Sequence, residues 1–151
     1  MATTKTTGQG ALKSVIFKYD VSSGDDSGAI SSVKLGTLPA NAVLTKSFID
    51  VATTFTSATD AATIALGITG DLTAFDSAIA ISNGGNPWDA GALRAGDQPT
   101  NQDAGPADGP SNLSDYHDIG TSNVDVFATV AVEAVTAGKL YLFVQYYVRE
   151  E

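Results

Sequence analysis

The clearest hydrophobic pattern in this chain lies near its C-terminal end. Between residues 124 and 133, apolar side chains alternate with polar ones such as Asp125, Thr129 and Glu133. A second alternating run extends from Leu140 to Val148, after the turn-forming sequence at 136–138. In a β-strand successive side chains point to opposite faces, so a hydrophobic period of two gives one apolar and one polar face. The pattern therefore predicts two strands joined as a β-hairpin.

Less regular alternation predicts further strands upstream. From Leu12 to Val21 the odd positions are apolar, and Ile16 is an apolar exception on the opposite face. Between residues 42 and 55 both faces are mixed, which indicates a long strand that bends or bulges. Residues 72–81 are compatible with either a strand or a short helix. The remaining predicted strands are 30–38 and 62–68.

Seven or eight strands with turn signals between them, and no convincing amphipathic helix, predict an all-β fold. We expect an antiparallel β-sandwich, jelly-roll-like, formed by a single domain over residues 12–151. Residues 1–11 lack periodicity and are expected to form a flexible, extended N-terminal arm. A long loop rich in glycine and proline is predicted at about 82–120.

The charge balance limits the partners that the chain can have. Seventeen acidic against eight basic residues give a formal net charge of −9. Such a field repels phosphate backbones and anionic lipids, so no nucleic acid partner is expected. The first ten residues lack the apolar region of a signal peptide, and no apolar stretch approaches the roughly 20 residues of a membrane span. We therefore expect no membrane partner, and synthesis in the cytoplasm.

Candidate catalytic and metal-binding chemistry is sparse. The chain has no cysteine and one histidine, His117, and it lacks a Gly-x-Ser-x-Gly motif, so an enzyme is not expected. Oxygen-rich side chains in the long loop suit calcium, although their spacing matches no EF-hand. We expect no cofactor. The calcium candidates are Asp103, Asp108, Asp115 and Asp118, with solvated aspartates in turns as the alternative.

Aromatic side chains offer candidate contact positions. Trp88, the only tryptophan, lies in the predicted loop, where it serves either as a binding anchor or, as we favour, as a plug that folds the loop onto the sandwich. The last predicted strand carries aromatic residues on both faces, including Tyr141 and Tyr147. One face of such a strand packs on the core, and the other meets either a second subunit or the long loop.

Several stretches resemble small structural proteins of tailed-phage virions, most closely the head decoration, or cement, proteins with a jelly-roll fold. The resemblance covers roughly residues 33–148 and rests on turn-and-strand patterns rather than on a chemical signature. The stretches that carry it are Leu35–Val43, Val51–Asp60, Ala65–Gly67, Val130–Ala134 and Ala137–Leu140.

The resemblance implies a homo-oligomer on the outer surface of the capsid, a trimer first and a dimer as the alternative. It implies the major capsid protein as partner, bound across capsomer junctions so that the shell is stabilised, and neither catalysis nor a cofactor. An arm from each subunit would add avidity. The candidate capsid or subunit contacts are Thr3, Thr4, Lys5, Thr6, Thr7, Trp88, Tyr116, Tyr141 and Tyr147.

Two alternatives to a decoration protein stay open, and the first of them shares this composition. One is another virion part, such as a head fibre base or a tail protein. The other is a carbohydrate-binding jelly roll that uses Trp88, Tyr116 and the loop aspartates together with calcium.

Overall fold

The computed structural model describes residues 12–96 and 117–149, which form nine β-strands and no helix. The predicted arm at 1–11 lies outside the described residues, as does much of the predicted long loop. The strands are β1 (Lys13–Asp20), β2 (Ser31–Leu38), β3 (Ala42–Ser57), β4 (Thr63–Ile68), β5 (Asp71–Ala80), β6 (Leu93–Ala95), β7 (His117–Asp118), β8 (Val124–Ala131) and β9 (Val135–Val148).

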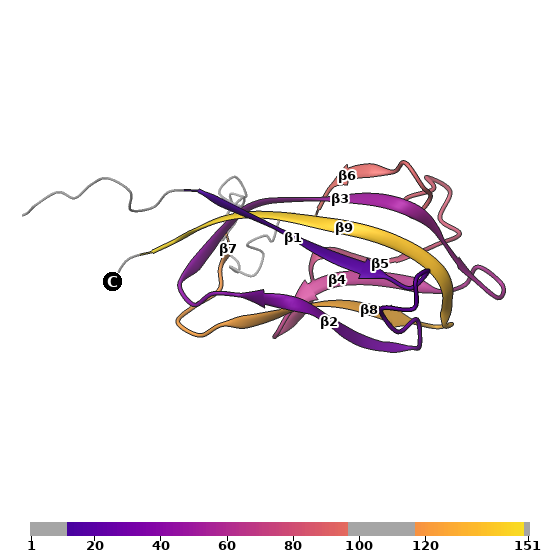
Figure 1. Cartoon of the computed structure of the whole chain (residues 1–151), viewed down its shortest axis with the longest axis horizontal. Helices are drawn as coiled ribbons and strands as arrows, with labels where there is room; N and C mark the ends of the chain where they lie inside the picture. The colour runs from indigo at the N-terminus through magenta and orange to yellow at the C-terminus, as the bar shows by residue number, and fades with distance from the viewer. Residues whose placement is uncertain (1–11, 97–116, 150–151) are drawn as a thin grey trace, which may run out of the picture.

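Two antiparallel sheets face each other (Figure 1). One sheet has the order β1-β9-β3-β6, with β7 also paired to β3, and the other has the order β2-β8-β4-β5. Among the described strands, β4 and β5 are the only two that are consecutive in the chain and pair with each other. The other consecutive strands lie in different sheets, except β6 and β7, which both pair with β3. The expected all-β antiparallel sandwich is therefore confirmed.

The predicted hairpin near the C-terminal end is wrong. β8 and β9 belong to opposite sheets, where β8 pairs with β2 and β4 while β9 pairs with β1 and β3. The chain turns between the sheets at residues 132–134, where Val132 has a positive φ of 71°. The residues predicted as the turn, 136–138, lie inside β9. Alternation indicates which side chains share a face, but it does not identify the neighbouring strand.

The other strand predictions agree closely with the structure. The ambiguous segment at 72–81 is the strand β5. The long third strand is bulged as predicted, since its register against β9 shifts at four places, the first between Leu44 and Lys46. Within the predicted loop, β6 and β7 are two short strands that the sequence did not reveal, and both pair with β3.

One hydrophobic core fills the space between the sheets. It draws buried side chains from both sheets, among them Leu140 and Leu142 of β9 and Val126 and Val130 of β8. No helix in the described ranges has the length and apolar character needed to cross a membrane. Fully buried large side chains include Tyr19, Leu38, Ile49, Ile64, Leu66, Phe75 and Trp88.

Candidate interaction surface

The outer face of the sheet that contains β9 carries the candidate surface. In β9, Leu140, Leu142 and Val144 are buried, and the alternating Tyr141 and Phe143 are partly exposed on the opposite face. The sequence-based expectation that one face of this strand packs on the core is therefore confirmed. Over the other face, the described residues form no further layer.

A row of apolar side chains crosses this outer face. Strand register aligns Ile16 of β1 with Phe143 of β9, Phe143 with Phe48 of β3, and Phe48 with Ala95 of β6. The rings of Phe48 and Phe143 are stacked, with centroids 4.5 Å apart and planes 10° apart. Ile16 is 53% exposed. We call these four residues the apolar row.

A second row of residues with mixed chemistry runs beside the first. Tyr141 lies opposite Lys18 on one side and Asp50 on the other, and Asp50 lies opposite Leu93. Leu93 is 66% exposed. The Lys139 ammonium lies 6.0 Å from the centre of the Tyr141 ring. An apolar centre with charged residues beside it is the composition of many protein interfaces.

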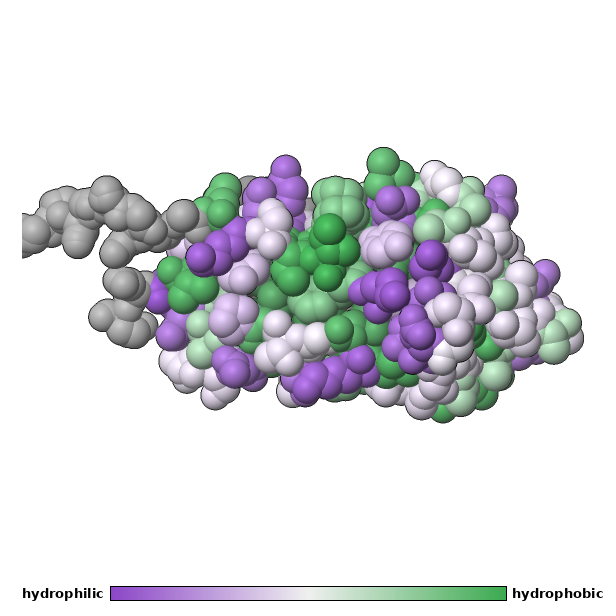
Figure 2. Space-filling view, in the orientation of Figure 1, coloured by the Kyte–Doolittle hydropathy of each residue, from purple (hydrophilic) through white to green (hydrophobic). Residues whose placement is uncertain are grey.

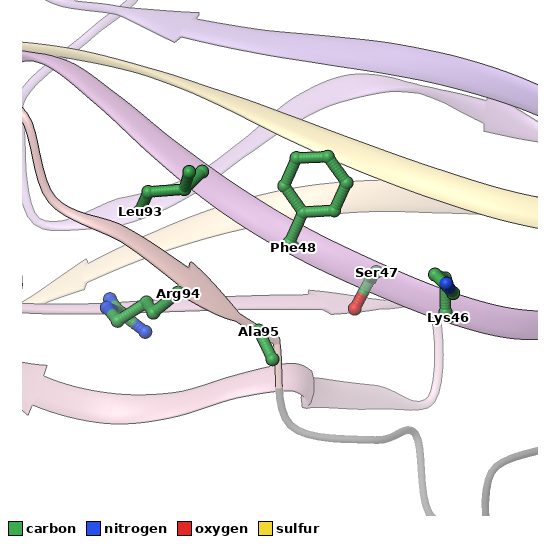
Figure 3. A pocket seen from close by; sticks show the side chains of 6 residues that line it. All are labelled: Lys46, Ser47, Phe48, Leu93, Arg94 and Ala95. Carbon is green, nitrogen blue, oxygen red and sulfur yellow. The ribbon is translucent and has the colours of Figure 1, made fainter.

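At the β6 edge the surface is hollowed. A pocket of about 470 Å³ is lined by residues of β3 and β6 (Figure 3). Figure 3 shows Phe48 and Leu93 projecting to one side of these strands, while Ser47 points to the other. The pocket thus continues the apolar row. Its lining residues are Lys46, Ser47, Phe48, Leu93, Arg94 and Ala95.

Trp88 lies inside the core, not on the surface. Its side chain is 0% exposed, and its Nε1–H donates a hydrogen bond to the Ile79 carbonyl oxygen at 3.0 Å. The ring meets Phe55 edge-on, with centroids 5.8 Å apart, and the Arg94 guanidinium lies 4.6 Å from its centre. The favoured interpretation of Trp88 as a plug is confirmed. A buried indole cannot contact a capsid or stack on a sugar, so the structure does not support those two roles for Trp88.

The calcium candidates are largely outside the described residues. Of the four, only Asp118 is described, and its carboxylate oxygens lie 3.1 Å and 3.2 Å from the Arg149 guanidinium. Its Oδ1 also accepts a hydrogen bond from the Gly120 N–H at 2.9 Å. Within the described ranges, no three acidic or histidine side chains are grouped closely enough to hold a metal ion. The candidates outside these ranges are Asp103, Asp108 and Asp115.

Some of the remaining predicted capsid or subunit contacts are described by the structure, and others lie outside the described residues. Tyr147 lies opposite Val43 of β3 and is partly exposed on the outer face, as is Tyr141. Tyr116 and the arm residues 3–7 lie outside the described residues. The structure therefore brings Tyr141 and Tyr147 to one face of β9, together with Phe143.

Chains in three solved phage capsids share this fold. A chain in the structure described as the cyanophage Pam1 capsid asymmetric unit matches with a TM-score of 0.59 and 18% identity, over 98% of this chain and 92% of that chain. A chain in the acidic stable capsid structure of Helicobacter pylori bacteriophage KHP30 matches with a TM-score of 0.58 and 15% identity, over 93% and 95%.

A chain in the capsid of Ralstonia phage GP4 matches with a TM-score of 0.53 and 18% identity, over 100% of this chain and 92% of that chain. At sequence identities this low, the structural match shows a shared fold alone. No protein-family model matches the sequence, and neither does any curated protein.

Sequence reasoning missed much of this outer face. Ile16 did leave a signal, because it breaks the alternation of the first strand and so had to face outward. Phe48 was hidden in the mixed pattern at 42–55, and Leu93 and Ala95 lie in a strand of three residues, which is too short to show a period. Besides Ile16, the pattern identified directly the aromatic residues of the last strand.

Proposed function

We propose that this protein is a structural component of a tailed-phage virion, namely a decoration or cement protein that binds the outer surface of the head. Its partner would be the major capsid protein, and it would stabilise the shell as a homo-oligomer bound across capsomer junctions. Its role would be structural and not enzymatic.

The observation that carries the proposal is the near full-length likeness to the capsid chains. The alignments cover at least 93% of this chain and at least 92% of each matching chain. The matching chains are therefore similar in size to this one. A small sandwich that makes up almost the whole of a chain in a capsid structure fits a part added to a shell.

The outer face supplies a means of attachment. Partly exposed Phe48 and Phe143, together with Leu93, present apolar area that a partner surface would bury, at about 25 cal/mol for each Å². The charged residues Lys18 and Asp50 beside this row would set orientation more than affinity. We therefore assign the outer face of the β1-β9-β3-β6 sheet as the surface that contacts the shell.

A binding assay with matched variants tests this assignment. Purified protein is mixed with capsids that lack it and sedimented, and the bound fraction is measured. Leu93→Asp should weaken binding about tenfold or more, because a carboxylate would be buried against the shell. Leu72→Asp is the matched control, since Leu72 is 40% exposed on β5 of the other sheet. Equal binding of the two variants would reject the outer face, and no binding by the wild-type protein would reject the function.

The position on the particle tests the alternative of a tail or head fibre component. Electron microscopy of virions that carry a labelled copy should show label over the head surface. Label confined to the tail would contradict the decoration role while leaving a virion role in place.

A further inference from the structure

Among the described strands, none pairs with β1 on the side away from β9, and this free edge is longer than that of β6 and more regular than those of β2 and β5. β1 pairs with β9 through eight consecutive residue pairs, from Lys13 with Tyr146 to Asp20 with Lys139, without a register shift. The edge strands of the other sheet are both interrupted, β2 between Lys34 and Gly36 and β5 at two places. Bulges of this kind protect sheet edges from pairing with other chains. β1 has no such interruption.

Hydrogen bonds at the end of β1 show which backbone groups face the free edge. The Val21 N–H donates to the Gly138 carbonyl oxygen of β9, at 2.9 Å. The Asp20 backbone points the other way, because its N–H donates to the Asp26 carboxylate at 2.7 Å and its carbonyl oxygen accepts from the Asp26 N–H at 3.0 Å. Since directions alternate along an antiparallel strand, the N–H and C=O groups of Ser14, Ile16 and Lys18 also face away from β9.

The side of the molecule along this edge is also apolar. Figure 2 shows hydrophobic residues gathered in the middle of the face that carries β1 and β2 in Figure 1. Val15 of β1 and Val33 and Leu35 of β2 are only partly buried against the core, and Ile16 is 53% exposed. An unpaired backbone edge thus coincides with exposed apolar side chains.

We propose that β1 pairs with β1 of a second copy, in antiparallel orientation about a two-fold axis at Ile16, so that one sheet continues through a dimer. In this register, all three residues whose backbone groups face away from β9 find a partner. Ser14 lies opposite Lys18 of the second copy, Ile16 lies opposite Ile16, and Lys18 lies opposite Ser14. These three pairs would exchange about six backbone hydrogen bonds. The pairing ends before Asp20, because the N–H and the carbonyl oxygen of Asp20 already form hydrogen bonds with Asp26.

The same register is favourable for the side chains. No like charges face each other directly, because each Lys18 lies opposite a serine. The two Ile16 side chains meet at the axis and join the apolar rows of both copies, since Ile16 lies next to Phe143 and Phe143 next to Phe48. A pairing shifted to centre on Lys18 would place two ammonium groups opposite each other, which is destabilising. The sequence of β1 is therefore self-complementary in one register.

This dimer deepens the homo-oligomer of the proposed function, but it is tested in solution without capsids, so it can fail while binding to the shell holds. Apart from Ile16 at the axis, the residues of the apolar row lie away from the β1 edge. Mass measurement in solution by light scattering should show a dimer for the wild-type protein. Ile16→Asp places two carboxylates at the axis and should raise the dissociation constant about 100-fold or more. Leu93→Asp, the same type of change on β6 of the same sheet, should leave the dimer intact. A wild-type monomer or trimer, or a dimer disrupted equally by both variants, would overturn the proposal.

Amide hydrogen exchange gives a second test that needs no variant. In the wild-type dimer the amides of Ser14, Ile16 and Lys18 should be protected, although β1 is an edge strand of the single chain. In Ile16→Asp these three amides should exchange rapidly, while those of Val15 and Phe17, which face β9, stay protected and show that the sheet is folded. Rapid exchange of all three amides in a wild-type dimer would place the interface elsewhere and overturn the proposal.

Discussion

Arg94 and Asp76 form an ion pair that connects the two sheets. Arg94 lies on β6, and its guanidinium reaches the Asp76 carboxylate on β5, 2.9 Å away. The Asp76 side chain is 3% exposed and that of Arg94 is 23% exposed. Because Arg94 also lies over the Trp88 ring, one side chain holds β6, the preceding segment and the opposite sheet together.

Removing one partner of this pair should be costly. Arg94→Ala removes the Arg94 charge from the buried Asp76 carboxylate, and we expect a loss of about 3 to 5 kcal/mol in the free energy of unfolding. Urea denaturation measures this loss. Arg149→Ala, which breaks the exposed pair with Asp118, is the matched control and should cost about 1 kcal/mol or less. Similar losses in the two variants would contradict a structural role for the buried pair.

Trp88 should behave as a core residue in two measurements. Its fluorescence should be shifted to shorter wavelength than that of free tryptophan and be shielded from iodide, because the indole is 0% exposed. Trp88→Ala should cost about 3 to 5 kcal/mol of stability. Strong quenching by iodide, together with unchanged stability in the variant, would instead indicate a surface anchor.

Glu133 should make stability depend on pH in the acid range. The Ser57 hydroxyl and the Thr59 N–H and hydroxyl donate hydrogen bonds to its carboxylate, which lowers the pKa of Glu133 to about 2 from an ordinary value of 4.5. A lowered pKa in the folded state stabilises the fold above the unfolded-state pKa, and this contribution is lost as the pH falls from about 4.5 to about 2.

Glu133→Gln tests this linkage. The variant should unfold at a lower temperature than the wild-type protein at neutral pH, and the two melting temperatures should converge as the pH falls to about 2. Thr59→Ala, which removes the hydroxyl donor alone, should show a smaller effect in the same direction. A constant difference between wild type and Glu133→Gln at all pH values would contradict the assigned cause.

Gly138 should be intolerant of a side chain. Its φ is 141°, and a Cβ at this position would collide with the Phe55 ring. We expect Gly138→Ala to cost about 3 kcal/mol, because strain and overpacking add. Gly24 has a φ of 83°, and nothing lies within 4 Å of the point that a Cβ would occupy there, so Gly24→Ala should cost only about 1 to 2 kcal/mol. Equal losses in denaturant unfolding would show that the contact with Phe55 is unimportant.

Strand positions could be predicted from the sequence where alternation is regular and long. The first strand was predicted to within one residue at each end, and its one irregularity, Ile16, marks the outer face. Pairing could not be predicted in this way. β8 and β9 both alternate well, but whether they form a hairpin or cross between sheets depends on a three-residue connection in which Val132 adopts a positive φ that valine rarely takes.

The candidate surface was predictable only in part, because strand pairing brings its residues together from separate parts of the sequence. Tyr141 and Tyr147 were identified from their own strand. Phe48 and Ala95 become neighbours only because β6 pairs with β3, and no local pattern indicates that a segment rich in glycine and proline returns to the sheet. The burial of Trp88 was anticipated from its chemistry, whereas its contact with Arg94 depends on the same return of the chain.

The central position of β9 has a consequence for folding kinetics. β9 lies between β1 and β3, so Lys13 finds its partner only in Tyr146, near the other end of the described chain. The entropy of closing so large a loop must be lost before these contacts contribute. Refolding from denaturant should therefore be slow, on the order of milliseconds to seconds, with late and cooperative acquisition of the sheet. Until β9 pairs with it, β1 is an unpaired strand, and the partly folded molecules are then most prone to aggregation.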